Sequence, residues 1–148
     1  MPYVGVDDKA AMRALALSVK AKNYDRIIYF SPALKYDDAF AQKLRFEGFK
    51  EAMVEADNYK TVVNIDELDR LICGKSAVIC STDYYALKVF FKDLKTDIYG
   101  FDNIKMLRDY SLPIKSADYS VKEIARLSVK NIFSASPTSI TIPYNIPF

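Results

Sequence analysis

Histidine is absent from the 148 residues of this chain. Histidine supplies the base in Ser-His-Asp and Cys-His arrangements and is a common zinc ligand, so its absence excludes all of these sites together. A hydrolytic activity would have to depend on carboxylates or lysines alone.

Cysteine and long apolar runs are also scarce. Cys73 lies next to a turn and Cys80 lies in an apolar run, so the two cysteines do not form a close metal-ligand pair. No apolar run approaches the roughly 20 residues that span a bilayer. The segment Met1–Val4 lacks a basic stretch followed by an apolar one. We therefore expect a cytoplasmic protein without membrane contact, and a buried, unreactive thiol at Cys80.

Neither sign of charge dominates the sequence. The 21 Lys and Arg residues and the 19 Asp and Glu residues give a formal net charge of +2. This charge is too small to suggest that the chain itself binds nucleic acid. Apolar residues make up 51% of the chain and charged residues 27%, which is typical of globular proteins. A chain of 148 residues is long enough to form one domain with a sizeable core.

Apolar periodicity alternates between strand-like and helix-like along the chain. Short apolar runs predict strands, and apolar residues three and four apart, as at Met12, Leu15 and Val19, predict helices. We expect strands at Arg26–Phe30, Thr61–Ile65, Ser76–Ser81 and Ile98–Phe101, and helices at Lys9–Lys22, Asp38–Ala56, Asp66–Ile72, Tyr84–Leu94, Ile104–Tyr110 and Val121–Phe133. This alternation predicts an α/β fold with a Rossmann-like or flavodoxin-like parallel sheet and helices on both faces.

Local features refine this prediction. Gly48 inside the second helix costs about 1 kcal/mol of helix propensity, which indicates close packing against a neighbour. The tail Ile140–Phe148 contains prolines, so it can be extended but cannot be a central strand.

The strand Ile98–Phe101 ends at Asp102. Ligands bind beyond the carboxyl ends of the strands in open parallel sheets, so Asp102 occupies a position expected for a functional residue.

Several motifs in order along the chain resemble the LacI/GalR transcriptional regulators and their periplasmic-binding-protein relatives. They are Val4-Gly5-Val6-Asp7-Asp8 before an Ala-rich helix, the Arg-x-x-Gly-(aromatic)-x-x-Ala pattern of Arg45–Ala52, the strand-to-helix turn Ser81–Leu87, and Gly100-Phe101-Asp102-Asn103 followed by Pro113. The resemblance implies one lobe of a periplasmic-binding-protein-like domain.

By this resemblance, residues 1–148 form a single domain that is the second half of an effector-binding domain. The family's helix-turn-helix, hinge helix and first subdomain are absent ahead of Tyr3. The resemblance implies a small sugar-like or polyol effector bound between two lobes, homodimerisation, and DNA contact only through the missing N-terminal domain. It implies neither an enzyme nor a cofactor. The chain departs from the family pattern at Lys88, where a small residue is usual, and in its tail, which lacks the usual Arg-Ser pair.

The resemblance places Asp102 and Arg45 in the effector site. A carboxylate at a strand end suits neighbouring sugar hydroxyls, and the fork of guanidinium donors suits vicinal hydroxyls or a carboxylate. The alternatives are a carboxylate that caps the next turn and a solvated helix charge paired with Asp38 or Glu47.

Thr82, Asp83, Tyr119 and Tyr36 complete the candidate ligand site. Thr82 and Asp83 lie where a strand ends and a helix begins, and Asp83 has the alternative role of an N-cap. Tyr119 falls where the family often carries a polar or aromatic residue near the cleft, and Tyr36 lies in the loop before the Arg45 helix. Asp7 is a weaker candidate.

The predicted dimer interface comprises Tyr84, Leu87, Lys88, Phe91 and Tyr110. The helix that contains most of them is more apolar than one buried face requires, and such a surplus marks a contact surface. A competing hypothesis from another class is a flavodoxin-like enzyme or a Mg²⁺-dependent phosphoacceptor domain that uses Asp7, Asp8 and a lysine.

Overall fold

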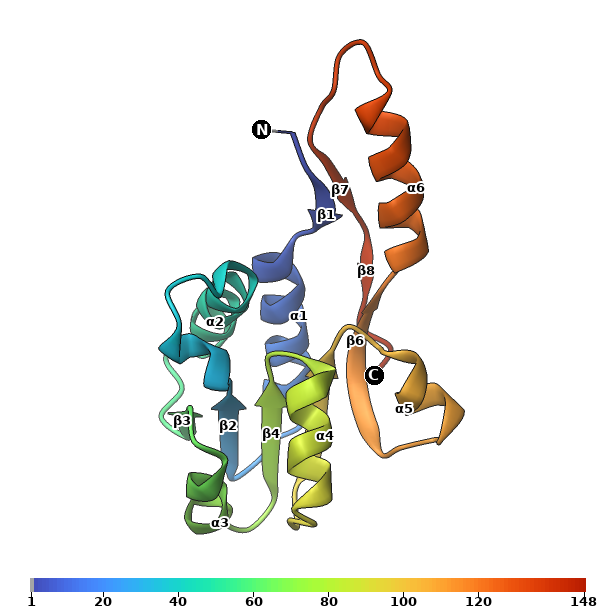
Figure 1. The fold of residues 1–148 in the computed structure, drawn as a ribbon. Coiled ribbons are helices and arrows are strands. Elements are labelled where there is room, and N and C mark those ends of the chain that lie inside the picture. The colour runs from blue at the N-terminus through green and yellow to red at the C-terminus, as the bar shows by residue number, and fades with distance from the viewer. Residues whose placement is uncertain (1) are drawn as a thin grey trace.

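The computed structural model describes residues 2–148. Its main sheet has six strands in the order β3-β2-β4-β5-β6-β8, all parallel except β8 (Figure 1). The strands are β1 (Val4–Val6), β2 (Arg26–Phe30), β3 (Tyr59–Val62), β4 (Ser76–Cys80), β5 (Asp97–Phe101), β6 (Ile114–Tyr119), β7 (Ile140–Ile142) and β8 (Tyr144–Asn145). The helices are α1 (Asp8–Lys20), α2 (Phe40–Ala52), α3 (Leu68–Leu71), α4 (Asp83–Phe91), α5 (Lys105–Asp109) and α6 (Val121–Ile132), with 3₁₀ turns at Pro32–Lys35 and Ile65–Glu67.

Each face of the main sheet is covered by helices. Because successive side chains of a strand point to opposite faces, Ile27 and Tyr29 of β2 pack under α1 and α2, while Ile28 and Phe30 pack under α3 and α4. The central strand β4 is buried along its whole length, as a parallel strand between helical layers should be. The predicted α/β fold with helices on both faces is therefore confirmed.

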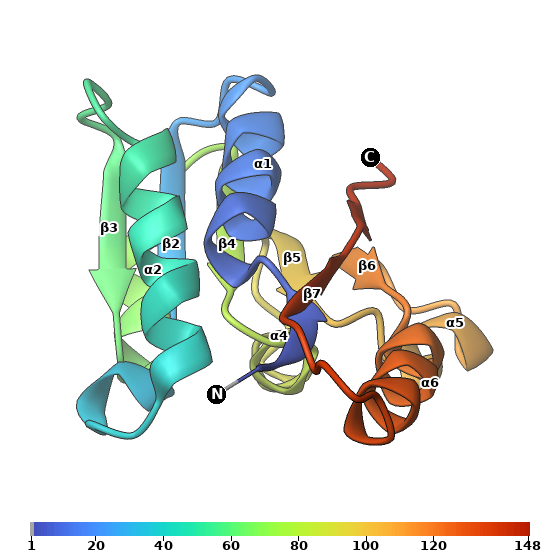
Figure 2. The same ribbon diagram turned by 90° about the horizontal axis from the view of Figure 1, so that it is seen from above.

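The chain leaves this layered lobe after β6 and builds a small second unit. Helix α6 and the parallel pair β1–β7 project beyond the main sheet at the upper end in Figure 1, and β8 returns the chain to the sheet edge. The pairing of Val4 with Ile140 brings together two segments that are separated by almost the whole sequence. Viewed from above, α6 lies well to one side of α1 and α2 (Figure 2).

The sequence pattern did not predict strand β6. Its buried residues are Ile114, Ser116 and Ala117, and the charged residues Lys115 and Asp118 stand among them, so the strand shows neither an apolar run nor strict alternation. Pairing with β5 in a buried position stabilises it instead. The tail follows its prediction, since β7 lies in the small pair and β8 at the sheet edge.

Helix caps fix the starts of the helices that bear on the site. The carboxylate of Asp7 accepts a hydrogen bond from the backbone N–H of Ala10 at 2.9 Å and caps α1. The hydroxyl of Thr82, rather than the carboxylate of Asp83, caps α4 by accepting from the N–H of Tyr85. The N-cap role considered for Asp83 is therefore wrong, because Asp83 is already the first residue of the helix.

Gly48 confirms the close packing predicted from its helix position. A Cβ atom at this residue would lie 2.2 Å from the backbone carbonyl oxygen of Lys9 on α1. Helices α1 and α2 therefore cross at a distance that only glycine permits. Within residues 2–148, no helix combines the length and the apolar character that a membrane crossing requires.

Candidate functional site

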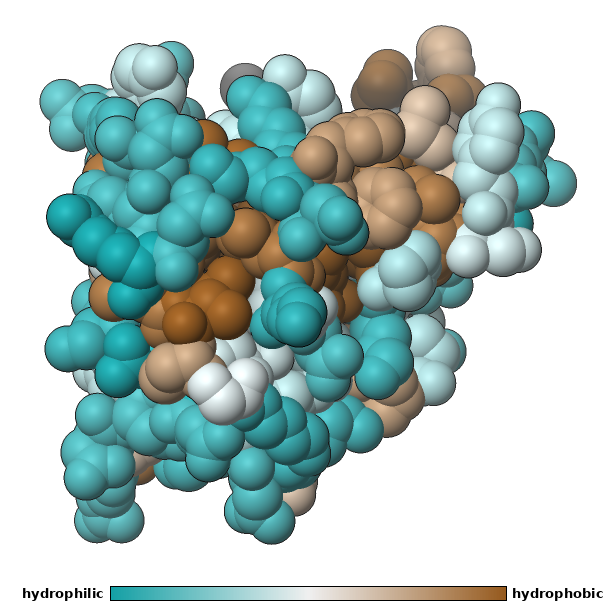
Figure 3. Space-filling view, turned by 90° about the horizontal axis from the view of Figure 1, so that it is seen from below, coloured by the Kyte–Doolittle hydropathy of each residue, from teal (hydrophilic) through white to brown (hydrophobic). Residues whose placement is uncertain are grey.

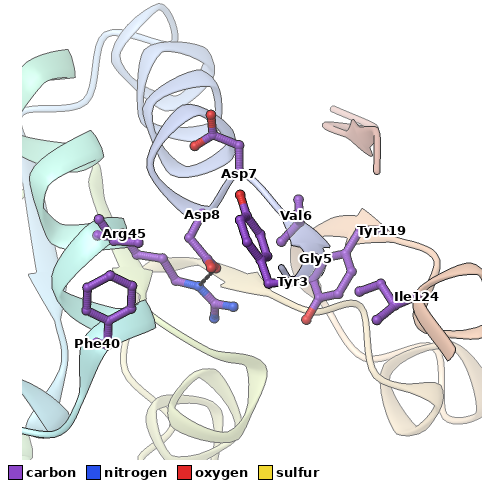
Figure 4. A pocket seen from close by; sticks show the side chains of 10 residues that line it. Tyr3, Gly5, Val6, Asp7, Asp8, Phe40, Arg45, Tyr119 and Ile124 are labelled. Atoms are coloured by element: carbon purple, nitrogen blue, oxygen red, sulfur yellow. Dashed lines mark hydrogen bonds and ion pairs between the residues drawn. The ribbon is translucent and has the colours of Figure 1, made fainter. Parts of the chain in front are cut away.

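A cavity of about 680 Å³ lies where the main lobe meets the second unit (Figure 4). Its volume is within the range of small-molecule sites. The lining comes from the start of α1, from α2, from β1 and from the β6–α6 junction: Tyr3, Gly5, Val6, Asp7, Asp8, Phe40, Leu44, Arg45, Tyr119 and Ile124. The cavity is therefore at the carboxyl-terminal edge of the parallel sheet, where ligands of such folds bind.

Arg45 is the central charged group of this cavity. Its Nε–H donates to Asp8 Oδ1 at 2.6 Å, Nη1 donates to the carbonyl oxygen of Ser81 at 2.7 Å, and Nη2 lies 3.2 Å from Asp102 Oδ1. The guanidinium also lies over the ring of Phe101, with 3.8 Å between its carbon and the ring centroid. Burial by itself lowers the pKa of Arg45, but the carboxylates of Asp102 and Asp8 outweigh it and raise that pKa.

Asp102 joins Arg45 to Tyr119. Its Oδ1 accepts a hydrogen bond from the Tyr119 hydroxyl at 2.9 Å as well as the contact with Arg45. Burial raises the pKa of Asp102, although Arg45 and Tyr119 oppose the shift. Burial, followed by the charge of Asp102, raises the pKa of Tyr119 to about 12, so at neutral pH the phenol is protonated and donates.

The local sequence explains why an arginine is buried here. Arg45 shares a face of α2 with Gly48, Phe49 and Ala52, which recur at three- and four-residue spacing and are buried. The same face packs on α1, whose first residue is Asp8. A buried guanidinium needs a paired charge, and Asp8 at the start of α1 supplies one.

The structure brings together only some of the residues predicted for the ligand site. Arg45 and Tyr119 line the main cavity, while Asp102 lines a second cavity of about 600 Å³ that shares Tyr119 with the first. Asp102, Arg45 and Tyr119 are thus in one hydrogen-bonded cluster, although they are far apart in the sequence.

Thr82, Asp83 and Tyr36 do not join this cluster. Thr82 is engaged in the cap of α4, and Asp83 is fully buried, so it has no surface that a ligand would touch. Tyr36 is exposed in the loop after β2 and is not part of the cavity lining. Phe40, at the start of α2, is an aromatic residue of the cavity lining from the same part of the chain.

The acidic pair at the start of α1 differs from its prediction. The sequence offered Asp7 as a weaker candidate for the ligand site, but its carboxylate caps the helix and points away from Arg45 in Figure 4, whereas Asp8 binds Arg45. The signal was present in the motif Asp7-Asp8, but only the helix phase decides which carboxylate faces α2. Tyr3 and Leu44 of the lining gave no signal in the sequence.

The acidic residues are not arranged for a metal ion. Among residues 2–148, no group of three or more His, Cys, Asp or Glu side chains is placed to hold one. Asp8, which the phosphoacceptor hypothesis required beside Mg²⁺, accepts the Nε–H of Arg45 instead. A cation would have to displace the guanidinium first, which weakens that hypothesis.

The structure is similar to solved structures of regulators and sugar-binding proteins. A LacI family transcriptional regulator from Silicibacter pomeroyi superimposes with a TM-score of 0.77 at 19% identity, over 99% of this chain and 63% of that one. A LacI family regulator from Enterococcus faecium with bound ribose gives 0.79 at 16%, over 99% and 63%. An ABC transporter periplasmic solute binding protein from Actinobacillus succinogenes with bound D-allose gives 0.79 at 15%, over 98% and 60%. Neither a protein-family model nor a curated protein matches the sequence.

The chain therefore has the fold of the effector-binding domains of LacI family regulators and of periplasmic sugar-binding proteins, as its motifs predicted. It spans less than two thirds of the length of these structures.

Proposed function

We propose that this chain is the effector-sensing part of a LacI/GalR-type transcriptional regulator, located in the cytoplasm. The observation that carries the proposal is the cluster of Asp8, Arg45, Asp102 and Tyr119, which lies at the sheet edge beside a cavity of ligand size. The ribose and D-allose bound by the similar proteins support a sugar as the ligand class.

The charges of the cluster favour a neutral polyol. Among the described residues that line the main cavity, Arg45 is the one cationic side chain, while Asp7 and Asp8 line it and Asp102 lies directly behind. An anionic ligand would meet a net negative wall, whereas hydroxyl groups can donate to the free carboxylate lone pairs. The guanidinium has five N–H donors, and those not directed at Asp8, Ser81 and Asp102 remain for ligand oxygens.

A titration by NMR tests this ligand class. D-Ribose and D-allose should shift the signals of Arg45 and Tyr119 in the millimolar range, because this lobe supplies only part of the enclosure that a sugar site needs. Ribose 5-phosphate, which adds negative charge, should not shift them. Equal responses to the neutral and the phosphorylated sugar would contradict the charge argument. A micromolar affinity would contradict the proposal that this lobe forms only part of the binding site.

Tyr119→Phe should weaken ribose binding by about five- to tenfold, because the change removes one hydrogen bond of about 1 kcal/mol and keeps the ring. The matched control is Tyr110→Phe, since Tyr110 is exposed away from the cavity. If both variants bind ribose like the wild type, Tyr119 is not part of the site.

The second unit supports the proposal that a first subdomain belongs opposite this lobe. A two-stranded parallel sheet is marginal in isolation, and parallel sheets occur with both faces covered. Helix α6 is amphipathic, yet none of its residues is buried, and Ile132 and Phe133 at its end are largely exposed. The similar structures are longer than this chain. In a longer protein, additional strands and helices would pair with β1 and β7 and would cover the apolar side of α6. DNA would be contacted by a further N-terminal domain.

The outer face of α4 supports homodimerisation. Tyr84 and Phe91 are 62% and 75% exposed, the ammonium of Lys88 lies over the Tyr84 ring, and Tyr110 at the end of α5 is also exposed. The view from below, toward the end of the molecule at which α4 finishes, shows a band of apolar residues between polar margins (Figure 3). Leu87, by contrast, is partly buried and packs on the core, so it is a poor probe of this surface.

Phe91→Glu should therefore convert a dimer into a monomer at micromolar concentration, because each interface would gain a charge that its symmetric copy repeats. Sedimentation velocity measures the change, and circular dichroism should show an intact fold. The control is Phe133→Glu, since Phe133 is a similarly exposed aromatic residue on the other unit. A wild-type monomer, or a dimer that only Phe133→Glu dissociates, would contradict the assignment of the α4 face.

A further inference from the structure

The loop that carries Asp102 has an unusual backbone. Asp102 and Asn103 have φ angles of 108° and 47°, in the region that residues other than glycine seldom adopt. Such conformations cost of order 1–3 kcal/mol each and persist only where surrounding contacts impose them. The contacts that impose this conformation therefore also determine where the carboxylate of Asp102 lies.

In these contacts, successive backbone N–H groups of the loop donate hydrogen bonds. The N–H of Asp102 donates to the carbonyl oxygen of Ala117 at 3.1 Å, that of Asn103 donates to Ser116 Oγ at 2.9 Å, and that of Ile104 donates to Asp83 Oδ2 at 2.8 Å. The last two acceptors are side chains rather than backbone. The loop is therefore held by a serine of β6 and an aspartate of α4, as well as by the sheet.

Asp83 and Ser116 are themselves linked. The Ser116 hydroxyl donates to Asp83 Oδ1 at 2.7 Å, so this serine accepts from the loop and donates to the aspartate. A Cβ atom at position 100 would lie 2.0 Å from Asp83 Oδ1, so Gly100 of β5 leaves the space that the carboxylate fills. Both side chains are buried and neither lines either of the two cavities described above.

A buried carboxylate is costly unless its lone pairs are used. Burial raises the pKa of Asp83 to about 6, although the Ser116 hydroxyl and the Ile104 N–H oppose the shift. An aspartate with no access to ligand thus occupies an unfavourable site at the junction of α4, β5 and β6, and its hydrogen bonds are to Ser116 and to the loop.

We propose that Asp83 and Ser116 are positioning residues that hold the loop 102–104 with Asp102 and Asn103 at positive φ, and so keep the Asp102 carboxylate against Arg45 and Tyr119. The consequence for sugar binding rests on the function proposed above. The effect on the loop and on the Arg45 ion pair does not depend on a ligand.

The test compares Ser116→Ala and Asp83→Ala with the wild type in the chain of residues 1–148. Amide hydrogen exchange should accelerate by about tenfold or more at Asn103 in Ser116→Ala, because its acceptor is removed. The Arg45 Nη2–H signal should shift in both variants as Asp102 moves, because Nη2 is the guanidinium nitrogen that contacts Asp102. Ser116→Thr keeps the hydroxyl and should restore both readouts. Ser76→Ala is the control, since Ser76 is also buried and hydrogen-bonded, but to Cys73 at the opposite end of the sheet.

The outcomes separate the two proposals. If Ser116→Ala lowers only the global stability, as Ser76→Ala does, and leaves the Asn103 exchange and the Arg45 signal unchanged, the positioning role is wrong. Should Ser116→Ala fail to fold, Asp83→Ala, which removes the acceptor of the Ile104 N–H, tests the same role through the Ile104 amide and the Arg45 signal, and unchanged readouts there would overturn it. If the loop readouts change as expected while D-ribose at millimolar concentration leaves wild-type Tyr119 unaffected, the positioning role stands and the proposed sugar site fails.

Discussion

Replacing Arg45 with alanine is expected to lower the free energy of unfolding by about 3–5 kcal/mol, the usual cost of removing one partner of a buried ion pair. The Arg45 side chain is 7% exposed, and its partners Asp8 and Asp102 are 16% and 24% exposed. Without the guanidinium, these carboxylates lose their counter-charge in a poorly solvated position, and the Ser81 carbonyl loses its donor. Lost packing on the Phe101 ring adds to the effect.

Urea denaturation of the two proteins measures this difference. The control is Arg126→Ala, because Arg126 forms a comparable ion pair with Glu123 on the surface of α6, with side chains 58% and 40% exposed. Exposed pairs of this kind contribute about 0–1 kcal/mol. Similar losses in both variants would show that the Arg45 cluster is no more strongly coupled than a surface pair.

A further variant tests the cause. Arg45→Met combined with Asp8→Asn and Asp102→Asn removes all of the charges of the cluster together, and it should recover much of the stability lost in Arg45→Met alone.

The stability lost in Arg45→Ala should also depend on pH. Burial raises the pKa of Asp102 and Arg45 lowers it, so removing Arg45 raises it further. A carboxyl group whose pKa is higher in the folded state than in the unfolded state stabilises the protein at acidic pH. This stabilisation is lost as the pH rises through the folded-state pKa. The deficit of Arg45→Ala should therefore be largest near neutral pH and shrink on acidification.

Gly48→Ala is expected to destabilise the protein by about 1–3 kcal/mol or more, as overpacking does. On helix propensity alone the change would add about 1 kcal/mol of stability. The sign is reversed because the new Cβ would lie 2.2 Å from the Lys9 carbonyl oxygen and 3.0 Å from the Arg13 nitrogen, both backbone atoms that cannot move as a side chain tip can. Helices α1 and α2 would have to separate, which would also move Asp8 away from Arg45.

Thermal and urea unfolding test this prediction, with Gly5→Ala as the control. A Cβ atom at Gly5 would meet only the Tyr3 ring, at the ordinary contact distance of 3.5 Å. A neutral or stabilising Gly48→Ala would mean that the two helices lie farther apart than the structure shows.

Much of the fold could be predicted from the sequence because its information is local. Strand β2 lies where its apolar run predicted, and β4 and β5 differ from their predictions by a single residue. Amphipathic spacing identified helices α1, α2, α4 and α6, and a glycine inside a helix indicated the close crossing at Gly48. The end of a strand follows from the strand itself, so the apolar run of β5 was enough to predict that Asp102 lies at the carboxyl edge of the sheet.

The tertiary structure decided which side chains meet. Strand β6 forms because β5 offers it a buried edge, and β1 pairs with β7 although almost the whole chain separates them in sequence. Helix phase selects Asp8 rather than Asp7 for Arg45, and it directs Asp83 into the core, where its carboxylate accepts a hydrogen bond from the Ile104 N–H. Hydrophobic periodicity describes only how apolar residues are spaced along the chain. Burial and pairing depend also on residues that are distant in the sequence and are brought close by packing.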